Sequence, residues 1–303
     1  MESNISDAEL SETLKPLSAK NKFFSKLGMI FIVIMMLIFA IMIFSAIVMQ
    51  NFFMVFFILF PVSGIIAAIF FKIASIYSKV KKQLIIDIVQ DALKNNFELL
   101  EYHPDEHISK VTVLESKLFN WNRINGSDLF HANYRGVGFM FSDLQLRSKR
   151  KKQTITIFSG QWLVINMGKE IDPSVTVTEL SGKSLAGDKR SKVQMESEAF
   201  NKEFAVFTEN AHKAFYVLTP HFMEFIMSLK QFTESRIHLC FTKNIASIAI
   251  NTRRDSFEPY QCEQDIAALR VRIQNEVDFI KRIVDGFLRN EQLFDPKSDN
   301  AKA

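Results

Sequence analysis

The chain has 303 residues, with 37 Lys and Arg against 33 Asp and Glu, which gives a formal net charge of +4. This small excess argues against a nucleic-acid partner, and it suits a domain beside an anionic membrane leaflet. The two cysteines, Cys240 and Cys262, are too few for the disulfide framework of a small secreted protein.

The N-terminal quarter of the chain is dominated by one long apolar stretch. Residues 1–26 are polar and electrically neutral, and they predict a mobile cytoplasmic tail. Residues 27–71 then contain no charged side chain over 45 positions. A helix of ~20 apolar residues spans a bilayer core. The two apolar blocks, 27–49 and 52–71, therefore predict a transmembrane helical hairpin joined at Gln50-Asn51.

Two other interpretations of this stretch are disfavoured. A cleaved signal peptide has a much shorter apolar core than residues 27–49. A buried helical hairpin of a soluble protein would not need 45 uncharged residues in succession.

Lysines flank the apolar stretch on both sides, and none lies inside it. They are Lys15, Lys20, Lys22 and Lys26 before it, and Lys72, Lys79, Lys81 and Lys82 after it. Lysine and arginine near the ends of a span favour the cytoplasmic side. We therefore expect a multi-pass protein of the cell membrane with both termini in the cytoplasm.

The remaining residues alternate between helical and strand patterns. Residues 76–97 carry apolar side chains at helical spacing and predict a juxtamembrane amphipathic helix. Alternation with period two predicts antiparallel strands at Val137–Leu146, Thr154–Phe158, Trp162–Met167 and Val175–Leu180.

The pattern continues through the second half of the soluble region. A strand is predicted at Ala214–Leu218, followed by a helix that Thr219 caps and Pro220 begins. Further strands are predicted at Arg236–Thr242 and Ile245–Asn251.

The soluble region as a whole predicts an α+β fold. Residues 98–259 are expected to form a cytoplasmic α+β domain on an antiparallel sheet. The sequence does not decide whether this domain is one unit or two lobes. Residues 260–290 form one long amphipathic helix, and residues 291–303 form a tail. The apolar spacing of the long helix suits packing along the domain or self-association as a homo-oligomer.

A basic run separates the first two predicted strands. Five of the six residues 147–152 are basic, and Lys149, Arg150, Lys151 and Lys152 are consecutive. The run is interpreted either as a solvated hairpin tip or as a membrane-surface site. In the second case each basic residue near anionic lipid contributes ~1 kcal/mol.

The segment His103-x-x-Glu106-His107 matches the H-x-x-E-H pattern of inverted zinc peptidases. That chemistry needs both histidines on one face of a helix as metal ligands, with the glutamate as general base. Pro104 disfavours a helical conformation at His103. We therefore favour a turn with solvent-exposed histidines and keep the metal site as an alternative.

Several short segments between residues 97 and 259 match a known family in their residue types and in their order along the chain. They are Phe97-Glu98, Tyr102-x-Pro104, Ile108, Ser116-x-Leu118-Phe119, Phe139-x-Phe141-Ser142-Asp143-Leu144, Phe200-Asn201-Lys202-Glu203-Phe204-x-Val206, Leu218-Thr219-Pro220 and Phe257-Glu258-Pro259. The chain thereby resembles a bacterial family with two transmembrane helices and a cytoplasmic domain of unknown function. It departs at Asn125-Gly126-Ser127-Asp128, where that family often has an acidic Gly-Glu-Asp segment. The resemblance implies the fold of the domain and a place in the bacterial inner membrane. It does not imply any activity.

The sequence predicts a membrane-anchored cytoplasmic binding or scaffold module. Its expected partners are the lipid bilayer and an unidentified cytoplasmic protein, with no cofactor and no catalytic residue. The alternative is a membrane-tethered metal-dependent hydrolase that uses His103, Glu106 and His107. A transporter is disfavoured because the two spans lack the charged groups that transport paths usually carry.

Overall fold

The computed structural model describes residues 7–48, 53–150, 153–180, 191–257, 266–290 and 292–294. Its internal contacts divide the chain into two units. The first comprises Met1–Val89 with Pro259–Arg272, and the second comprises Gln90–Glu258 with Ile273–Ala303.

Two long helices begin the chain, and most of their length belongs to the first unit. They are α1 (Asp7–Val48) and α2 (Phe53–Asn96), and α2 runs without a break through the predicted juxtamembrane helix. Within α1, Ala19–Ile41 is a stretch of 23 residues with a mean hydropathy of 2.5, long and apolar enough to cross a membrane. No second stretch in the described helices meets that criterion. The second span stays a prediction, and the predicted joint at Gln50-Asn51 lies outside the described residues.

Aromatic rings connect α1 to α2. The ring of Phe70 stacks on Phe24, with 6.0 Å between centroids, and on Phe31, with 5.3 Å. Gly28 permits close packing at the same level, since a Cβ there would lie 2.9 Å from the ring of Phe71.

The second unit is built on one antiparallel sheet of seven strands, as the sequence predicts. The strands are β1 (Glu98–His103), β2 (Arg123–Tyr134), β3 (Val137–Arg150), β4 (Gln153–Glu179), β5 (Ser191–Val193), β6 (Phe204–Thr208) and β7 (Arg236–Asn251). Their order is β1-β2-β3-β4-β6-β5, and β7 pairs with β4. The described strands thus form a single sheet.

Strand β4 has 27 residues and pairs with three other strands. It joins three runs that the sequence analysis separated, at Thr154–Phe158, Trp162–Met167 and Val175–Leu180. Strand β7 likewise joins two predicted strands. Lys243, between them, adopts a positive φ of +51° where the pairing is irregular, so the break in the pattern is a bulge and not a turn.

Five helices complete the α+β architecture. They are α3 (Lys110–Glu115), α4 (Glu198–Glu203), α5 (Ala211–Val217), α6 (Pro220–Thr233) and α7 (Ile266–Leu288). The predicted start of α6 is confirmed, because the Thr219 side chain accepts a hydrogen bond from the Phe222 N–H and Pro220 is the first helical residue. The predicted strand at Ala214–Leu218 is wrong, because Asn210 caps a helix there by accepting from the His212 N–H.

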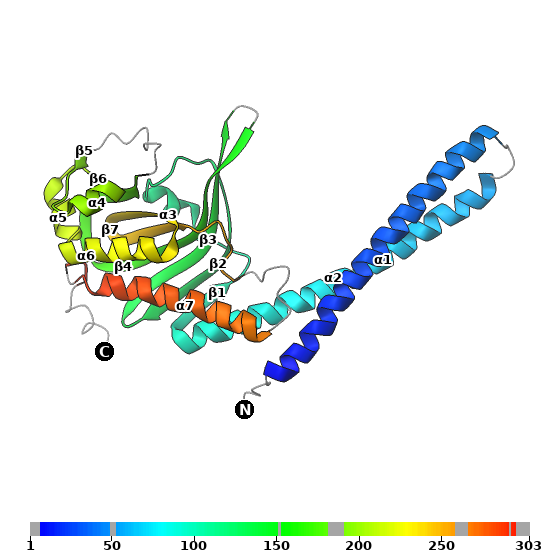
Figure 1. Ribbon diagram of the computed structural model, residues 1–303, viewed down its shortest axis with the longest axis horizontal. Helices are drawn as coiled ribbons and strands as arrows, with labels where there is room; N and C mark the ends of the chain where they lie inside the picture. The colour runs from blue at the N-terminus through cyan, green and yellow to red at the C-terminus, as the bar shows by residue number, and fades with distance from the viewer. Residues whose placement is uncertain are drawn as a thin grey trace. The chain divides into compact units, whose positions relative to one another are not determined.

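Helices cover both faces of the sheet (Figure 1). On one face, the ring of Phe222 in α6 lies 6.0 Å from Phe241 of β7 and 5.0 Å from Phe287 of α7. On the other face, residues around α3 pack with Trp162 and Cys240 in a second apolar cluster. Neighbouring residues of β7, Cys240 and Phe241, therefore point to opposite faces, as alternation along a strand requires.

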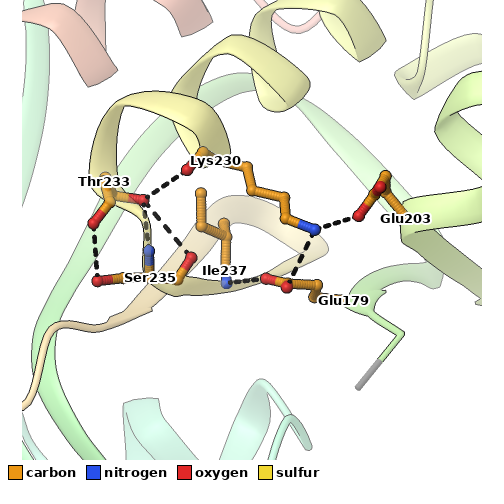
Figure 2. A network of polar contacts seen from close by, with 6 residues as sticks. All are labelled: Glu179, Glu203, Lys230, Thr233, Ser235 and Ile237. Carbon is orange, nitrogen blue, oxygen red and sulfur yellow. Dashed lines mark hydrogen bonds and ion pairs between the residues drawn. The ribbon is translucent and has the colours of Figure 1, made fainter. Parts of the chain in front are cut away.

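Lys230 anchors the C-terminal end of α6 (Figure 2). Its Nζ lies 3.1 Å from Oε1 of Glu179 on β4, and it also pairs with the carboxylate of Glu203 at the end of α4. The second oxygen of Glu179 accepts a hydrogen bond of 3.2 Å from the Ile237 N–H of β7. Lys230 thus ties α6 directly to β4 and α4, and Glu179 extends this contact to β7.

Candidate functional site

Three aspartates from distant parts of the sequence meet in the second unit. The ligand atoms of Asp128, Asp143 and Asp255 all lie within 4.8 Å of one another, the one such group among the described residues with metal-ligating potential. We call these three residues the aspartate cluster.

Sheet geometry brings the cluster together. Irregular pairing between β2 and β3 places Asp128 in the left-handed conformation, with φ +58°, which Asp tolerates better than most residues. Asp143 lies on β3, opposite Ser127. Asp255 follows the end of β7, in the segment that leads to the buried ring of Phe257.

Hydrogen bonds from neighbouring residues hold each carboxyl group. Ser256 donates twice to Asp143, from its N–H at 2.7 Å and from its hydroxyl at 3.0 Å. The Tyr102 hydroxyl donates to Oδ1 of Asp128 at 2.8 Å. The hydroxyl of Ser127 donates to Oδ2 of Asp255 at 3.0 Å.

Gln161 of β4 extends the network toward α7. It is the register partner of Asp143, and its Nε2 donates to the Ser256 hydroxyl and to Glu276 of α7, both at 2.8 Å. Its Oε1 is buried and has no hydrogen-bond partner among the described residues.

Burial raises the pKa of two of the carboxyl groups, those of Asp128 and Asp143. Asp128 is 7% exposed, and burial, followed by the nearby charge of Asp255, raises its pKa to about 7. Burial and the same neighbour raise the pKa of Asp143 well above its ordinary value. Burial and Asp128 also raise the pKa of Tyr102, which keeps its hydroxyl a donor. Asp128 therefore takes up a proton near neutral pH.

Oxygen atoms of carboxylates are also the ligands that Mg²⁺ and Ca²⁺ prefer. The donor set of Asp128, Asp143 and Asp255 fits a hard divalent cation, which would stabilise the charged carboxylates that burial disfavours. Shared protons and a bound cation are thus two ways to relieve the same repulsion.

The predicted metal segment lies at the end of β1 and in the following turn. His103 is exposed and its Nε2 lies 3.4 Å from Glu101. The Glu106 N–H donates to the His103 carbonyl at 3.2 Å, and Nδ1 of His107 lies 2.8 Å from the carbonyl oxygen of Ile108. The segment forms a turn, in which His103 is exposed and His107 is half-buried. These side chains do not join the described metal-capable group, and the metal site stays an untested alternative.

The basic run occupies the hairpin between β3 and β4. Lys149 pairs with Thr154, and Arg150 with Gln153, so the two strands flank the tip as predicted. Lys151 and Lys152 lie outside the described residues. The role of this run at a membrane surface stays a prediction.

Sequence reasoning missed the aspartate cluster. Asp128 enters that reasoning only in the segment that departs from the resembled family, and Asp143 only as part of the predicted strand Val137–Leu146 and of a segment that resembles the family. One available signal is that each aspartate adjoins a serine, in Ser127-Asp128, Ser142-Asp143 and Asp255-Ser256. The pattern points to a cluster only when it is known that β2 pairs with β3 and that the segment after β7 lies beside them.

The structure defines an α+β domain of antiparallel sheet that accompanies an apolar N-terminal helix. Residues 156–289 match a family described as "Protein of unknown function (DUF3137)", in agreement with the expected domain of unknown function. Comparison with curated proteins gives no significant match. A solved structure of the mycobacterial trehalose monomycolate transport factor A, TtfA, is similar with a TM-score of 0.35 and 11% identity, over 64% of this chain and 93% of that one.

Proposed function

We propose that this chain is a membrane-anchored binding module whose α+β domain lies in the cytoplasm. The observation that carries the proposal is the apolar surface of α1 between Ala19 and Ile41. The side chain of Met36 is 65% exposed and that of Leu37 is 58% exposed. Many of the neighbouring apolar side chains are exposed to a similar degree. Such a continuous apolar surface is unfavourable in water and suits a lipid environment.

A second span in α2 is part of the proposal. The whole stretch 27–71 lacks charge, and the flanking lysines favour the cytoplasm for both of its ends. Ring contacts between Phe70 and residues of α1 support the pairing of the two helices. A cysteine at position 51 should accordingly react with a membrane-impermeant reagent from outside the cell, whereas cysteines near either terminus should not.

Burial of the aspartate cluster favours a structural role for it over catalysis. Asp128 and Asp143 are only 7% and 5% exposed, so a substrate has little access to their carboxyl groups. The cluster therefore suits a role in holding β2, β3 and the segment after β7 together, with or without an ion.

The basic run is proposed to dock on anionic lipid. Four basic residues at ~1 kcal/mol each favour contact with an anionic leaflet. Replacing Lys149, Arg150, Lys151 and Lys152 by Gln should lower the ratio of docked to free hairpin at least about a hundredfold. The measurement is quenching of a dye at Ser148→Cys, in a Cys262→Ser background, by quencher-labelled headgroups in anionic nanodiscs.

A matched variant controls for the change in net charge. It replaces Lys94, Lys192, Lys202 and Lys213 by Gln and should leave the quenching unchanged. Equal quenching in anionic and zwitterionic nanodiscs would contradict the docking proposal and leave the basic run as a solvated tip.

A further inference from the structure

The stretch of chain that forms most of α1 and α2 carries charge of one sign. Residues 13–86 contain no Asp and no Glu, and all of their positive charge comes from lysines that flank the apolar stretch 27–71. We call these residues the lysine collar: Lys15, Lys20, Lys22, Lys26, Lys72, Lys79, Lys81 and Lys82. No carboxylate of the same stretch neutralises them.

Ring contacts bring the two halves of the lysine collar to one level of the helix pair. The ring of Phe24 in α1 stacks on that of Tyr77 in α2, with 5.8 Å between centroids. The Nζ of Lys20 lies 5.9 Å from the centroid of the same Tyr77 ring. Lys26 and Lys72 are exposed and lie within two helical turns of this contact on their own helices. Positive charge from both helices therefore gathers at the same end of the apolar stretch.

A hollow of about 370 Å³ on the surface of α1 begins at this level. Its described lining consists of one lysine and four apolar residues that follow it: Lys26, Met29, Ile30, Val33 and Ile34. Their spacing of three and four places them on one face of the helix. Phe24, Gly28 and Phe31 lie on another face, which packs against α2. The hollow therefore opens away from α2 and runs for about 12 Å along α1.

This combination of charge and apolar surface complements a phospholipid. A phospholipid has an anionic phosphate directly beside its acyl chains, and the hollow has an ammonium group directly beside an apolar lining. Basic residues at the cytoplasmic end of a span attract anionic headgroups. A zwitterionic headgroup also carries an ammonium group, for which residues 13–86 provide no carboxylate partner. The charge pattern thus favours a lipid with net negative charge.

We propose that the hollow beside Lys26 binds an anionic phospholipid of the cytoplasmic leaflet. The phosphate pairs with Lys26, and the rest of the lysine collar attracts the negative charge of the headgroup. One acyl chain lies along the apolar lining toward Ile34. The inference rests on the proposed membrane anchor, to which it adds a preferred class of lipid and a site for it.

Quenching of tryptophan fluorescence by brominated lipids tests the proposal on the full chain in reconstituted bilayers. The reporter is Leu37→Trp, an exposed position one turn beyond the hollow. The probes are phosphatidylglycerol and phosphatidylcholine with brominated acyl chains. Trp121 and Trp162 are buried in the second unit and contribute a constant background. The ratio of the two binding constants at the reporter should favour phosphatidylglycerol at least about fivefold.

One substitution and a second reporter locate the site. Lys26→Gln should lower the ratio about fivefold, because the ammonium group beside the phosphate is lost. Lys192→Gln, at an exposed lysine of β5, is the matched control and should leave the ratio unchanged. The second reporter is Ile65→Trp, an exposed position of α2. Because Gly64 lies beside Met35, this reporter has a depth similar to that of the hollow, and its ratio should be close to one.

Equal binding of the two lipids at Leu37→Trp would overturn the proposal and leave only unselective lipid around the helices. An unchanged ratio in Lys26→Gln, or the same preference at Ile65→Trp, would also overturn it. Replacing residues 149–152 by Gln should not alter the ratio, so the docking of the basic run is tested separately. Absence of quenching by either lipid would contradict the membrane anchor itself, and with it the lipid site.

Discussion

Replacing Asp128 by Asn is expected to stabilise the α+β domain at pH 8 and to remove much of its dependence on pH. Burial and the neighbouring Asp255 raise the pKa of Asp128 from 3.8 to about 7 in the folded chain. The folded state therefore holds more protons than the unfolded chain between these values, and stability falls as pH rises through this window. A rise of this size corresponds to roughly 4 kcal/mol.

Asparagine suits this position in every other respect. It has the shape of the protonated carboxyl group and adopts the left-handed backbone conformation readily. Its side-chain oxygen still accepts the hydrogen bond from Tyr102. We expect Asp128→Asn to raise the free energy of unfolding by roughly 2–4 kcal/mol at pH 8 and by little at pH 4.

Urea denaturation of the full chain, followed by tryptophan fluorescence, measures this change. Both tryptophans, Trp121 and Trp162, lie in the second unit, so the signal reports the α+β domain alone. Asp91→Asn, at an exposed position of α2, is the control and should change neither stability nor its pH dependence. A loss of stability in Asp128→Asn at all pH values would show that the charged carboxylate is required.

The same assay separates shared protons from a bound cation. If Mg²⁺ or Ca²⁺ occupies the aspartate cluster, either ion should stabilise the parent chain, and Asp128→Asn should abolish that effect. Without an ion site, both chains should respond equally to either salt.

Replacing Gly160 by Ala should destabilise the domain strongly. Gly160 lies in β4 with φ +154°, and a Cβ there would lie 2.3 Å from the Ile250 carbonyl oxygen and 2.6 Å from the Thr252 nitrogen. Both contacts are with the backbone of β7 and the residues after it, which cannot move aside without disturbing the pairing of β4 and β7. We expect a loss of roughly 3 kcal/mol or more in the free energy of unfolding, measured by the same denaturation.

Gly138→Ala is the matched control for this substitution. Gly138 also lies in the sheet, but the nearest atoms to its Cβ position are the side-chain ends of Asn133 and Asn166, both at 3.1 Å. These can shift, so the expected change is small. Equal effects of the two substitutions would mean that β7 does not approach Gly160 as closely as the structure shows.

Features determined by neighbouring residues could be predicted from the sequence. Thr219 and Pro220 mark the start of α6, because a capping hydroxyl and a preset φ act within one turn. Alternation with period two identified β3 and most of β4, and the apolar spacing identified α7. Each of these signals lies within the element that it predicts.

Features that depend on distant residues could not be predicted in this way. The apolar residues of Ala214–Leu218 fit a strand or a short helix, and capping by Asn210 decides for the helix. Asp255 reaches Asp128 and Asp143 only because β7 and its following segment return to the strands that carry them. A pattern of serine and aspartate in the sequence contains no information about that return.

Thiol labelling of intact cells tests the central claim most directly, namely that a two-span anchor holds the domain in the cytoplasm. Single cysteines would be placed at Ser3, Asn51 and Ser298 in a Cys262→Ser chain, in which the remaining Cys240 is buried. We predict that a membrane-impermeant maleimide labels Asn51→Cys in intact cells, and the other two only after permeabilisation. Labelling of Ser3→Cys or Ser298→Cys in intact cells, or protection of Asn51→Cys, would contradict the account.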